Sequence, residues 1–329
     1  MARREWPLDE LVAGLRAGDR RALARAISHV ENGDPISYPL VHELYGETGR
    51  ATVIGVTGPP GVGKSTLVGA LVAHLRAQER TVGVVSVDPS SPFTHGALLG
   101  DRIRLADHFT DPGVYIRSMG SRGHLGGVAE STLQAVLLLD AFGKDVIFVE
   151  TVGAGQSDVA VTGVADSVLL VLMPGSGDSV QALKAGIMEI PDVIAINKMD
   201  QPNAKTMLDE VRSIVRLAPP DGRPPILLTE ALRGENVDEL WAKLEEHRAK
   251  LVGEGKLDER RQRNLAREVF AVASGRVTSQ LEATVRSDPE LEGLLDAVQR
   301  RELDPLTAVD EIIRAVFHTE VEDGRSRTS

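Results

Sequence analysis

The residues with the most direct chemical meaning form one octapeptide, Gly58-Pro59-Pro60-Gly61-Val62-Gly63-Lys64-Ser65. It fits the pattern G-x-x-x-x-G-K-[ST], in which a glycine-rich turn lets backbone N–H groups converge on phosphate oxygens. The apolar run Val53–Val56 precedes the turn, and apolar residues at helical spacing follow it, so a helix N-terminus adds partial positive charge. We predict that Lys64 reaches the β- and γ-phosphates and that the Ser65 hydroxyl ligates Mg²⁺. The predicted phosphate-binding set is Gly58, Pro59, Pro60, Gly61, Val62, Gly63, Lys64, Ser65 and Thr66.

A second motif, Asn197-Lys198-Met199-Asp200, has the residue types that a guanine pocket needs. Asp200 can accept hydrogen bonds from the ring N–H and the exocyclic amine of guanine, whereas adenine would leave this carboxylate unpaired. We expect Asn197 to hold the loop and reach the base edge, and the aliphatic part of Lys198 to lie along the ring. The segment Thr229-Glu230-Ala231 follows another apolar run and is predicted to form a second base-contacting loop.

Three carboxylates follow predicted strands and suit a magnesium and γ-phosphate site. They are Asp88, Asp101 and Glu150, and the predicted metal set is completed by Ser65. Mg²⁺ keeps several waters and takes few protein ligands, so Asp88 or Asp101 could bind it through water or orient the attacking water. Gly153 could offer its N–H to the γ-phosphate. Phosphoryl transfer depends on positioning and charge stabilisation, so Lys64 and the three carboxylates form the predicted catalytic set.

Elements that could position these groups are visible as six short apolar runs. The runs are Val53–Val56, Val82–Val87, Val146–Val149, Val168–Leu172, Val193–Ile196 and Ile226–Leu228. They are continuous, rich in β-branched residues and separated by helix-length segments, which is typical of strands buried on both faces of a parallel sheet. Ligands of such sheets bind at the carboxyl ends of the strands, where all the motifs lie. The expected fold is therefore an α/β P-loop NTPase with a mostly parallel central sheet flanked by helices.

Helical patterns at both ends predict three parts. Residues 1–48 form an N-terminal helical extension, 49–250 the nucleotide-binding domain, and 251–329 a C-terminal helical arm. Within the arm, Asp288-Pro289 and Asp304-Pro305 each have the pattern of an N-cap followed by a first-turn proline.

Composition limits the class of protein. The 329 residues are 42% hydrophobic and 26% charged, which is ordinary for a globular protein. The net charge of −11 argues against a nonspecific nucleic-acid partner. The sequence has no cysteine, which excludes disulfides and thiolate metal sites. No signal peptide or long apolar run is evident, so we expect no membrane partner and a cytoplasmic location.

Taken in order, these motifs resemble those of the MeaB/ArgK GTPase family. The resemblance spans about residues 50 to 240 and includes Asp88-Pro89-Ser90-Ser91 and Glu150-Thr151-Val152-Gly153. It implies a homodimeric P-loop GTPase that binds GTP and GDP with Mg²⁺ and is a chaperone of a cobalamin-dependent acyl-CoA mutase, typically methylmalonyl-CoA mutase. Such proteins gate cofactor loading and protect the mutase from inactivation. The resemblance also implies that Lys184 lies in a third switch that responds to the mutase, and that the C-terminal arm dimerises.

Three alternatives remain open at this point. One is a kinase or transport-associated ATPase, against which Asp200 argues. Another is a metal-insertion GTPase, whose relatives usually carry a histidine-rich tract or clustered cysteines that this sequence lacks. The last is a nucleotide-dependent scaffold with slow turnover. Competition between GTP and ATP separates the first from the GTPase.

Overall fold

The computed structural model describes residues 6–88, 105–120, 127–151, 163–175 and 191–317. The chain divides into two compact units, Met1–Phe270 and Ala271–Ser329, which are described separately. The three-part division predicted above stays a prediction.

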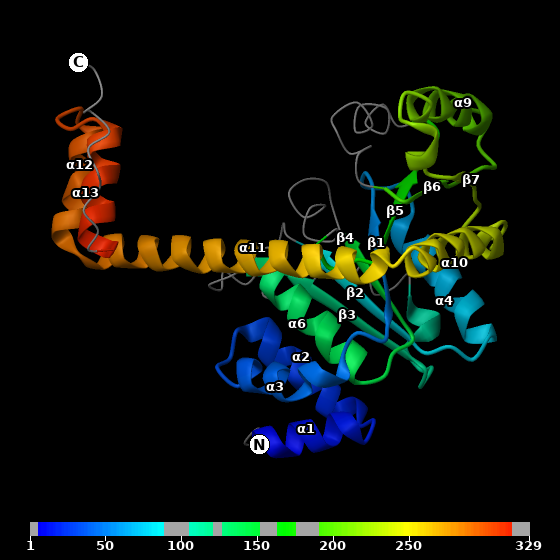
Figure 1. Cartoon of the computed structure of the whole chain (residues 1–329), viewed down its shortest axis with the longest axis horizontal. Helices are drawn as coiled ribbons and strands as arrows, with labels where there is room; N and C mark the ends of the chain where they lie inside the picture. Colours follow the sequence, from blue (N-terminus) through cyan, green and yellow to red (C-terminus); the bar gives the residue numbers. More distant parts are fainter. Residues whose placement is uncertain (1–5, 89–104, 121–126, 152–162, 176–190, 318–329) are drawn as a thin grey trace. The chain divides into compact units, whose positions relative to one another are not determined.

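The first unit is built on a sheet of seven strands, all parallel, in the order β3-β2-β4-β1-β5-β6-β7 (Figure 1). All six predicted runs are strands of this sheet. The strands are β1 (Thr52–Thr57), β2 (Val82–Asp88), β3 (Val114–Gly120), β4 (Val146–Thr151), β5 (Ser167–Leu172), β6 (Val193–Ile196) and β7 (Ile226–Leu228). The predicted runs do not include β3, which lies at the sheet edge and carries Arg117 and Ser118 in its middle. An edge strand is less enclosed than a central one, so polar residues interrupt its apolar pattern.

Helices cover both faces of the sheet (Figure 1). On one face, α4 and α10 pack against side chains such as Ile54, Phe148 and Val171. On the other face, α6 covers β2, β3 and β4, with α1–α3 packed beyond it, and α9 covers β5 and β6. The helices are α1 (Leu8–Arg16), α2 (Arg20–Asn32), α3 (Ser37–Leu44), α4 (Lys64–Ala77), α6 (Gly127–Ala141), α9 (Ala204–Val215) and α10 (Val237–Gly253). The described residues also include three short 3₁₀ turns, η1 (Tyr45–Glu47), η2 (Ala106–His108) and η4 (Pro220–Gly222).

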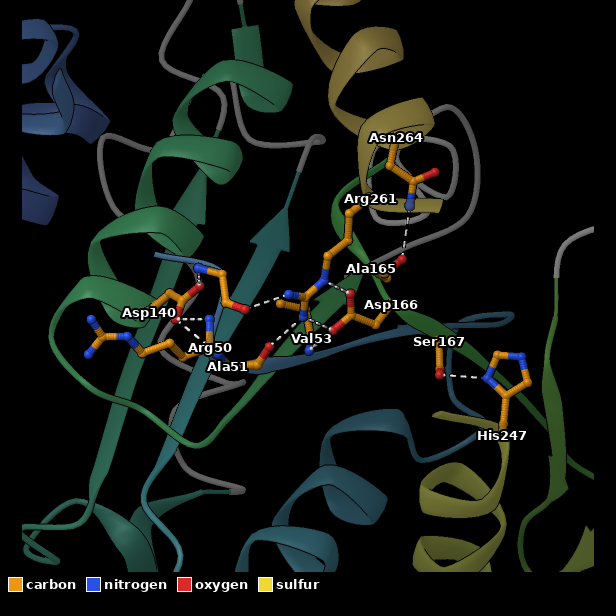
Figure 2. Close-up of polar contacts among 11 residues, drawn as sticks. Arg50, Ala51, Val53, Asp140, Ala165, Asp166, Ser167, His247, Arg261 and Asn264 are labelled. Carbon is orange, nitrogen blue, oxygen red and sulfur yellow. Dashed lines mark hydrogen bonds and ion pairs between the residues drawn. The ribbon is translucent and has the colours of Figure 1, made fainter. Parts of the chain in front are cut away.

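The beginning of α11 (Lys256–Ser287) is held by polar contacts at the amino ends of the strands. Arg260 forms a two-pronged ion pair with Asp192, at 2.9 and 2.6 Å. Arg261 does the same with Asp166, at 2.6 and 2.7 Å, and also donates to the Gly49 and Ala51 carbonyls (Figure 2). Bidentate guanidinium–carboxylate pairs fix geometry as well as charge, so they define where α11 begins on the first unit.

The second unit contains the rest of α11 together with α12 (Pro289–Gln299) and α13 (Pro305–Phe317). Both predicted N-caps are present: Asp288 accepts from Glu290 N at 2.9 Å, and Asp304 accepts from Leu306 N and Thr307 N at 3.1 Å. Several apolar side chains of this unit are exposed, namely Val277, Leu295, Leu306, Val309 and Phe317. In the part of the chain that is described, none of the helices has the length and apolar character needed to cross a membrane.

Candidate functional site: a nucleotide pocket at the carboxyl ends of the strands

The predicted phosphate-binding loop connects β1 to α4, and α4 begins at Lys64. Two of its glycines are required by their surroundings. Gly58 has φ +140°, and a Cβ there would lie 2.1 Å from the Val171 carbonyl oxygen of β5. Gly63 has φ +92°, and a Cβ there would lie 2.5 Å from Asn197 Nδ2. The loop therefore fits against both β5 and the predicted guanine motif only because these side chains are absent.

Lys64 and Ser65 begin α4 and are both buried, at 6% and 5% exposed. Lys64 Nζ donates to the carbonyls of Gly58 and Pro59, at 2.6 and 3.1 Å. These bonds turn the ammonium group into the loop that is predicted to surround the phosphates. Among the other predicted phosphate-binding residues, Val62 is fully buried in the core, while Pro60 and Gly61 are exposed. Thr66 lies half-buried in the first turn of α4.

Ser65 and Glu150 are brought together although 85 residues separate them in sequence. The Ser65 hydroxyl donates to Glu150 Oε1 at 2.5 Å, and Glu150 is only 1% exposed. β4 lies beside β1 in the sheet, so the end of β4 brings Glu150 to the start of α4. A hydroxyl and a carboxylate at a helix N-terminus are oxygen donors of the kind Mg²⁺ prefers, so these residues fit the predicted ion.

Asn197 joins the phosphate loop to both base loops. Its Nδ2 donates to the Val62 carbonyl at 3.0 Å, and its Oδ1 accepts from Ala231 N at 3.1 Å. The Thr229 hydroxyl lies 3.5 Å from the same oxygen, and Thr229 O accepts from Met199 N at 3.1 Å. Asn197 is 2% exposed, so these hydrogen bonds lie in the interior. The amide therefore aligns the three predicted nucleotide-binding segments with one another.

Lys198 connects the first base loop to the phosphate loop. Its backbone has φ +59°, its Nζ donates to the Gly61 carbonyl at 2.9 Å, and it also contacts Met173 Sδ at 3.2 Å. Its side chain therefore spans from the base loop to the phosphate loop. The expected position of its aliphatic part along a guanine ring stays a prediction. The predicted site did not include Met173. Its position directly after β5, the neighbour of β1, was the available signal.

Asp200 and Glu230 form an acidic pair in the predicted base pocket. Asp200 is exposed at the turn after β6, whereas Glu230 is 4% exposed. The hydrogen bond to Glu230 lowers the pKa of Asp200, and the same hydrogen bond, with burial, raises the pKa of Glu230. Of the two carboxyls, Glu230 therefore holds a proton more strongly and Asp200 ionises more readily. Glu230 Oε1 also accepts from Leu232 N at 3.2 Å, which fixes the carboxyl in its own loop. This pairing is consistent with Asp200 as the acceptor for guanine.

The remaining predicted site residues are only partly located. Asp88 is the last residue of β2, but its side chain lies outside the described residues. Asp101, Gly153 and Lys184 also lie outside them. Their predicted roles as metal, γ-phosphate and switch residues stay predictions.

The fold and these contacts define a P-loop nucleotide-binding protein, and comparisons with known proteins identify its class. The family described as Methylmalonyl Co-A mutase-associated GTPase MeaB matches residues 23–286. The chain belongs to this family and is a P-loop GTPase that binds guanine nucleotide.

Individual relatives agree over nearly the whole chain. A Pyrococcus abyssi protein named as a GTPase is 44% identical over 315 residues, covering 94% of this chain and 97% of the relative. GTPase ArgK of Escherichia coli is 34% identical over 318 residues, covering 94% and 96%. The crystal structure of a LAO/AO transport system kinase superposes with a TM-score of 0.72 at 27% identity, covering 97% of this chain and all of that one. The resemblance inferred from the motifs is confirmed.

Proposed function

We propose that this GTPase is a chaperone of a cobalamin-dependent acyl-CoA mutase, in which GTP binding and hydrolysis gate cofactor loading and protect the mutase. The description of the family as methylmalonyl-CoA mutase-associated supports a partner of this class. A mouse relative named as a methylmalonic aciduria type A homolog, 34% identical over 275 residues, supports methylmalonyl-CoA mutase in particular. The cytoplasmic location stays a prediction.

The observation that carries the nucleotide chemistry is the set of contacts that Asn197 makes. Because one buried amide bonds both the phosphate loop and the second base loop, base recognition and phosphate binding share one framework. Asp200 accepts from the guanine ring N–H and amine, while Ala231 and Thr229 hold the loop that encloses the base edge. Adenine would leave Asp200 without its donors, so we expect strong preference for GTP.

Hydrolysis then depends mainly on positioning and on charge stabilisation at the phosphates, so the protein needs no strong general base. Lys64 moves from its two carbonyl acceptors to the β- and γ-phosphates, where its charge stabilises the transferring group. Ser65 and Glu150 would hold Mg²⁺, which supplies charge neutralisation at the phosphates when bound. Asp88 or Asp101 orients the attacking water.

A homodimer formed through the second unit completes the proposal. The exposed apolar side chains of α11, α12 and α13 are contributed by a small unit that buries few residues of its own. A second copy of this unit would remove such a surface from water.

The test is GTP hydrolysis by the purified protein with and without methylmalonyl-CoA mutase, with ATP in parallel and Lys64→Ala as the inactive reference. GTP-selective turnover that the mutase stimulates is the expected result. GTP turnover without a mutase effect would reject the partner and keep the GTPase. ATP turnover at a comparable rate would favour the kinase or transport ATPase alternative. Wild-type turnover by Lys64→Ala would reject the phosphate site.

A further inference from the structure

A cavity of about 240 Å³ lies at the amino end of β1, away from the nucleotide pocket. Thr52, Arg80, Trp241, Glu245 and Arg248 provide its polar lining. Thr52 is the first residue of β1, whereas Gly58 of the phosphate loop follows the last one, and six residues of strand span about 20 Å. The cavity is therefore a separate site on the first unit.

Trp241, which lines the cavity, contains a polar group without an acceptor among the described residues. Trp241 is 2% exposed, and its indole N–H has no hydrogen-bond partner in the part of the chain that is described. Buried donors in native proteins are nearly always paired, so an unpaired indole N–H on a residue that lines a cavity indicates an acceptor that enters from outside. Thr52 shares the sheet face of Ile54 and Val56, which pack in the same cluster as Trp241, so its side chain lies on the cavity side.

The cavity also has one guanidinium more than its carboxylate can neutralise. Arg80 is already engaged: it pairs with Glu245 at 2.7 Å and stacks on the Trp241 ring, 5.3 Å from its centroid. Arg248 is half-buried, forms no ion pair among the described residues, and has a buried Nε without an acceptor. The charged side chains that line the cavity therefore carry a net charge of one positive unit, which resides on Arg248. Guanidinium groups match oxyanions because their parallel N–H donors bind two oxygens at once.

We propose that Arg248, Trp241 and Thr52 form a binding site for a small oxyanion, the phosphate or carboxylate group of a ligand. The guanidinium of Arg248 supplies the charge and paired donors, the indole N–H supplies a third donor, and the Thr52 hydroxyl a fourth. Arg80 keeps the indole ring in place by stacking on it. The site is independent of guanine nucleotide, because none of these residues belongs to the nucleotide pocket.

The two tryptophans of the chain provide a direct test. The full-length protein, labelled with ¹⁵N-tryptophan and saturated with GDP and Mg²⁺, gives one indole signal from Trp6 and one from Trp241, assigned with Trp6→Phe. Sodium phosphate, sodium acetate and sodium chloride are titrated separately at constant ionic strength. We expect the Trp241 signal to move along a saturable curve at millimolar phosphate or acetate, while Trp6 stays unchanged as the internal control. The anion that saturates at the lower concentration identifies the preferred group.

Matched variants decide whether Arg248 is responsible. Arg248→Gln should weaken the anion by at least about tenfold, whereas Arg212→Gln, which removes an exposed arginine of α9, should leave the curve unchanged. Thr52→Val nearly keeps the side-chain volume and should weaken binding several-fold, and it serves if Arg248→Gln does not fold. The proposal is overturned if neither oxyanion moves the Trp241 signal, if chloride moves it equally, or if the well-folded variants bind like the wild type.

Discussion

Glu268 of α11 should make the stability of the first unit fall as pH rises. It is 4% exposed, and its carboxyl lies against Gly163, where a Cβ would be 1.7 Å from Oε1. Its Oε2 is buried and has no hydrogen-bond partner among the described residues. Burial raises the pKa of Glu268 from 4.5 to about 7, against a smaller opposing effect of Arg267.

The raised pKa of Glu268 sets both the direction and the size of the change in the free energy of unfolding with pH. A carboxyl with a raised pKa in the folded state contributes stability that is fully present below pH 4.5 and is lost as pH rises through about 7. Each pKa unit corresponds to about 1.4 kcal/mol, so the full loss between these limits is about 3 kcal/mol. Glu268→Gln cannot ionise and keeps nearly the same shape, so it should lack this loss.

Urea unfolding followed by tryptophan fluorescence measures this difference, because Trp6 and Trp241 both lie in the first unit. The free energies of unfolding of wild type and Glu268→Gln are compared from about pH 5 to about pH 8. The difference in unfolding free energy between the two proteins should change in favour of the variant by roughly 2.5 kcal/mol over this range, because part of the full loss has already occurred by about pH 5. Glu259→Gln, an exposed glutamate of the same helix, should run parallel to the wild type. Parallel curves for Glu268→Gln would refute the reasoning that burial controls this carboxyl.

Three further predictions concern the base pocket and the second unit. Asp200→Asn should weaken GDP by about 10²-fold, the loss of a charged acceptor, and should favour xanthosine nucleotides; an unchanged preference in competition binding would remove Asp200 from the pocket. Glu230→Gln should make GDP affinity less dependent on pH above 4.5, because the hydrogen bond to Asp200 and burial raise the pKa of Glu230, whose carboxyl ionises as pH rises and whose amide replacement does not; equal pH profiles would contradict the pairing. Deletion of residues 271–329 should give a folded monomer in light scattering, because the contacts of Arg260 and Arg261 are kept; a dimer would place the interface in the first unit.

The strands that carry the site were predictable because they are buried on both faces. A central parallel strand tolerates few polar interruptions, so β1, β2, β4, β5 and β6 appear in the sequence as nearly continuous apolar runs, with Ser86 in β2 as a small polar exception. β3 does not meet this criterion, because Arg117 interrupts its apolar pattern. Arg117 reaches the N-terminal helices and pairs with Glu31, a contact that exists only once the layers are assembled. The polar residues in its middle hide this strand, since β7 lies at the other edge of the sheet and was predicted.

The segments of the nucleotide pocket were predictable for a different reason. Their residue types are dictated by the ligand, so Lys64, Ser65 and Asp200 can be recognised from the amino-acid sequence alone. The contacts between the segments could not be predicted in the same way. Asn197 reaches Val62 only because β6 and β1 flank β5, and no spacing in the sequence encodes that order.

The ion pairs at the amino ends of the strands could not be predicted for the same reason, because they depend on the order of the strands in the sheet. Arg260 and Arg261 read as solvated charges of a polar helix, because their carboxylate partners lie 68 and 95 residues earlier. Asp166 accepts from Arg261 and from the Val53 backbone, and it directly precedes β5, whose Val171 carbonyl touches Gly58 at the other end. One short strand therefore connects the attachment of α11 to the phosphate loop. Because that strand is fully buried and paired on both sides, movement at either end is resisted by the whole sheet, and the position of α11 and the geometry of the phosphate loop depend on the same packing.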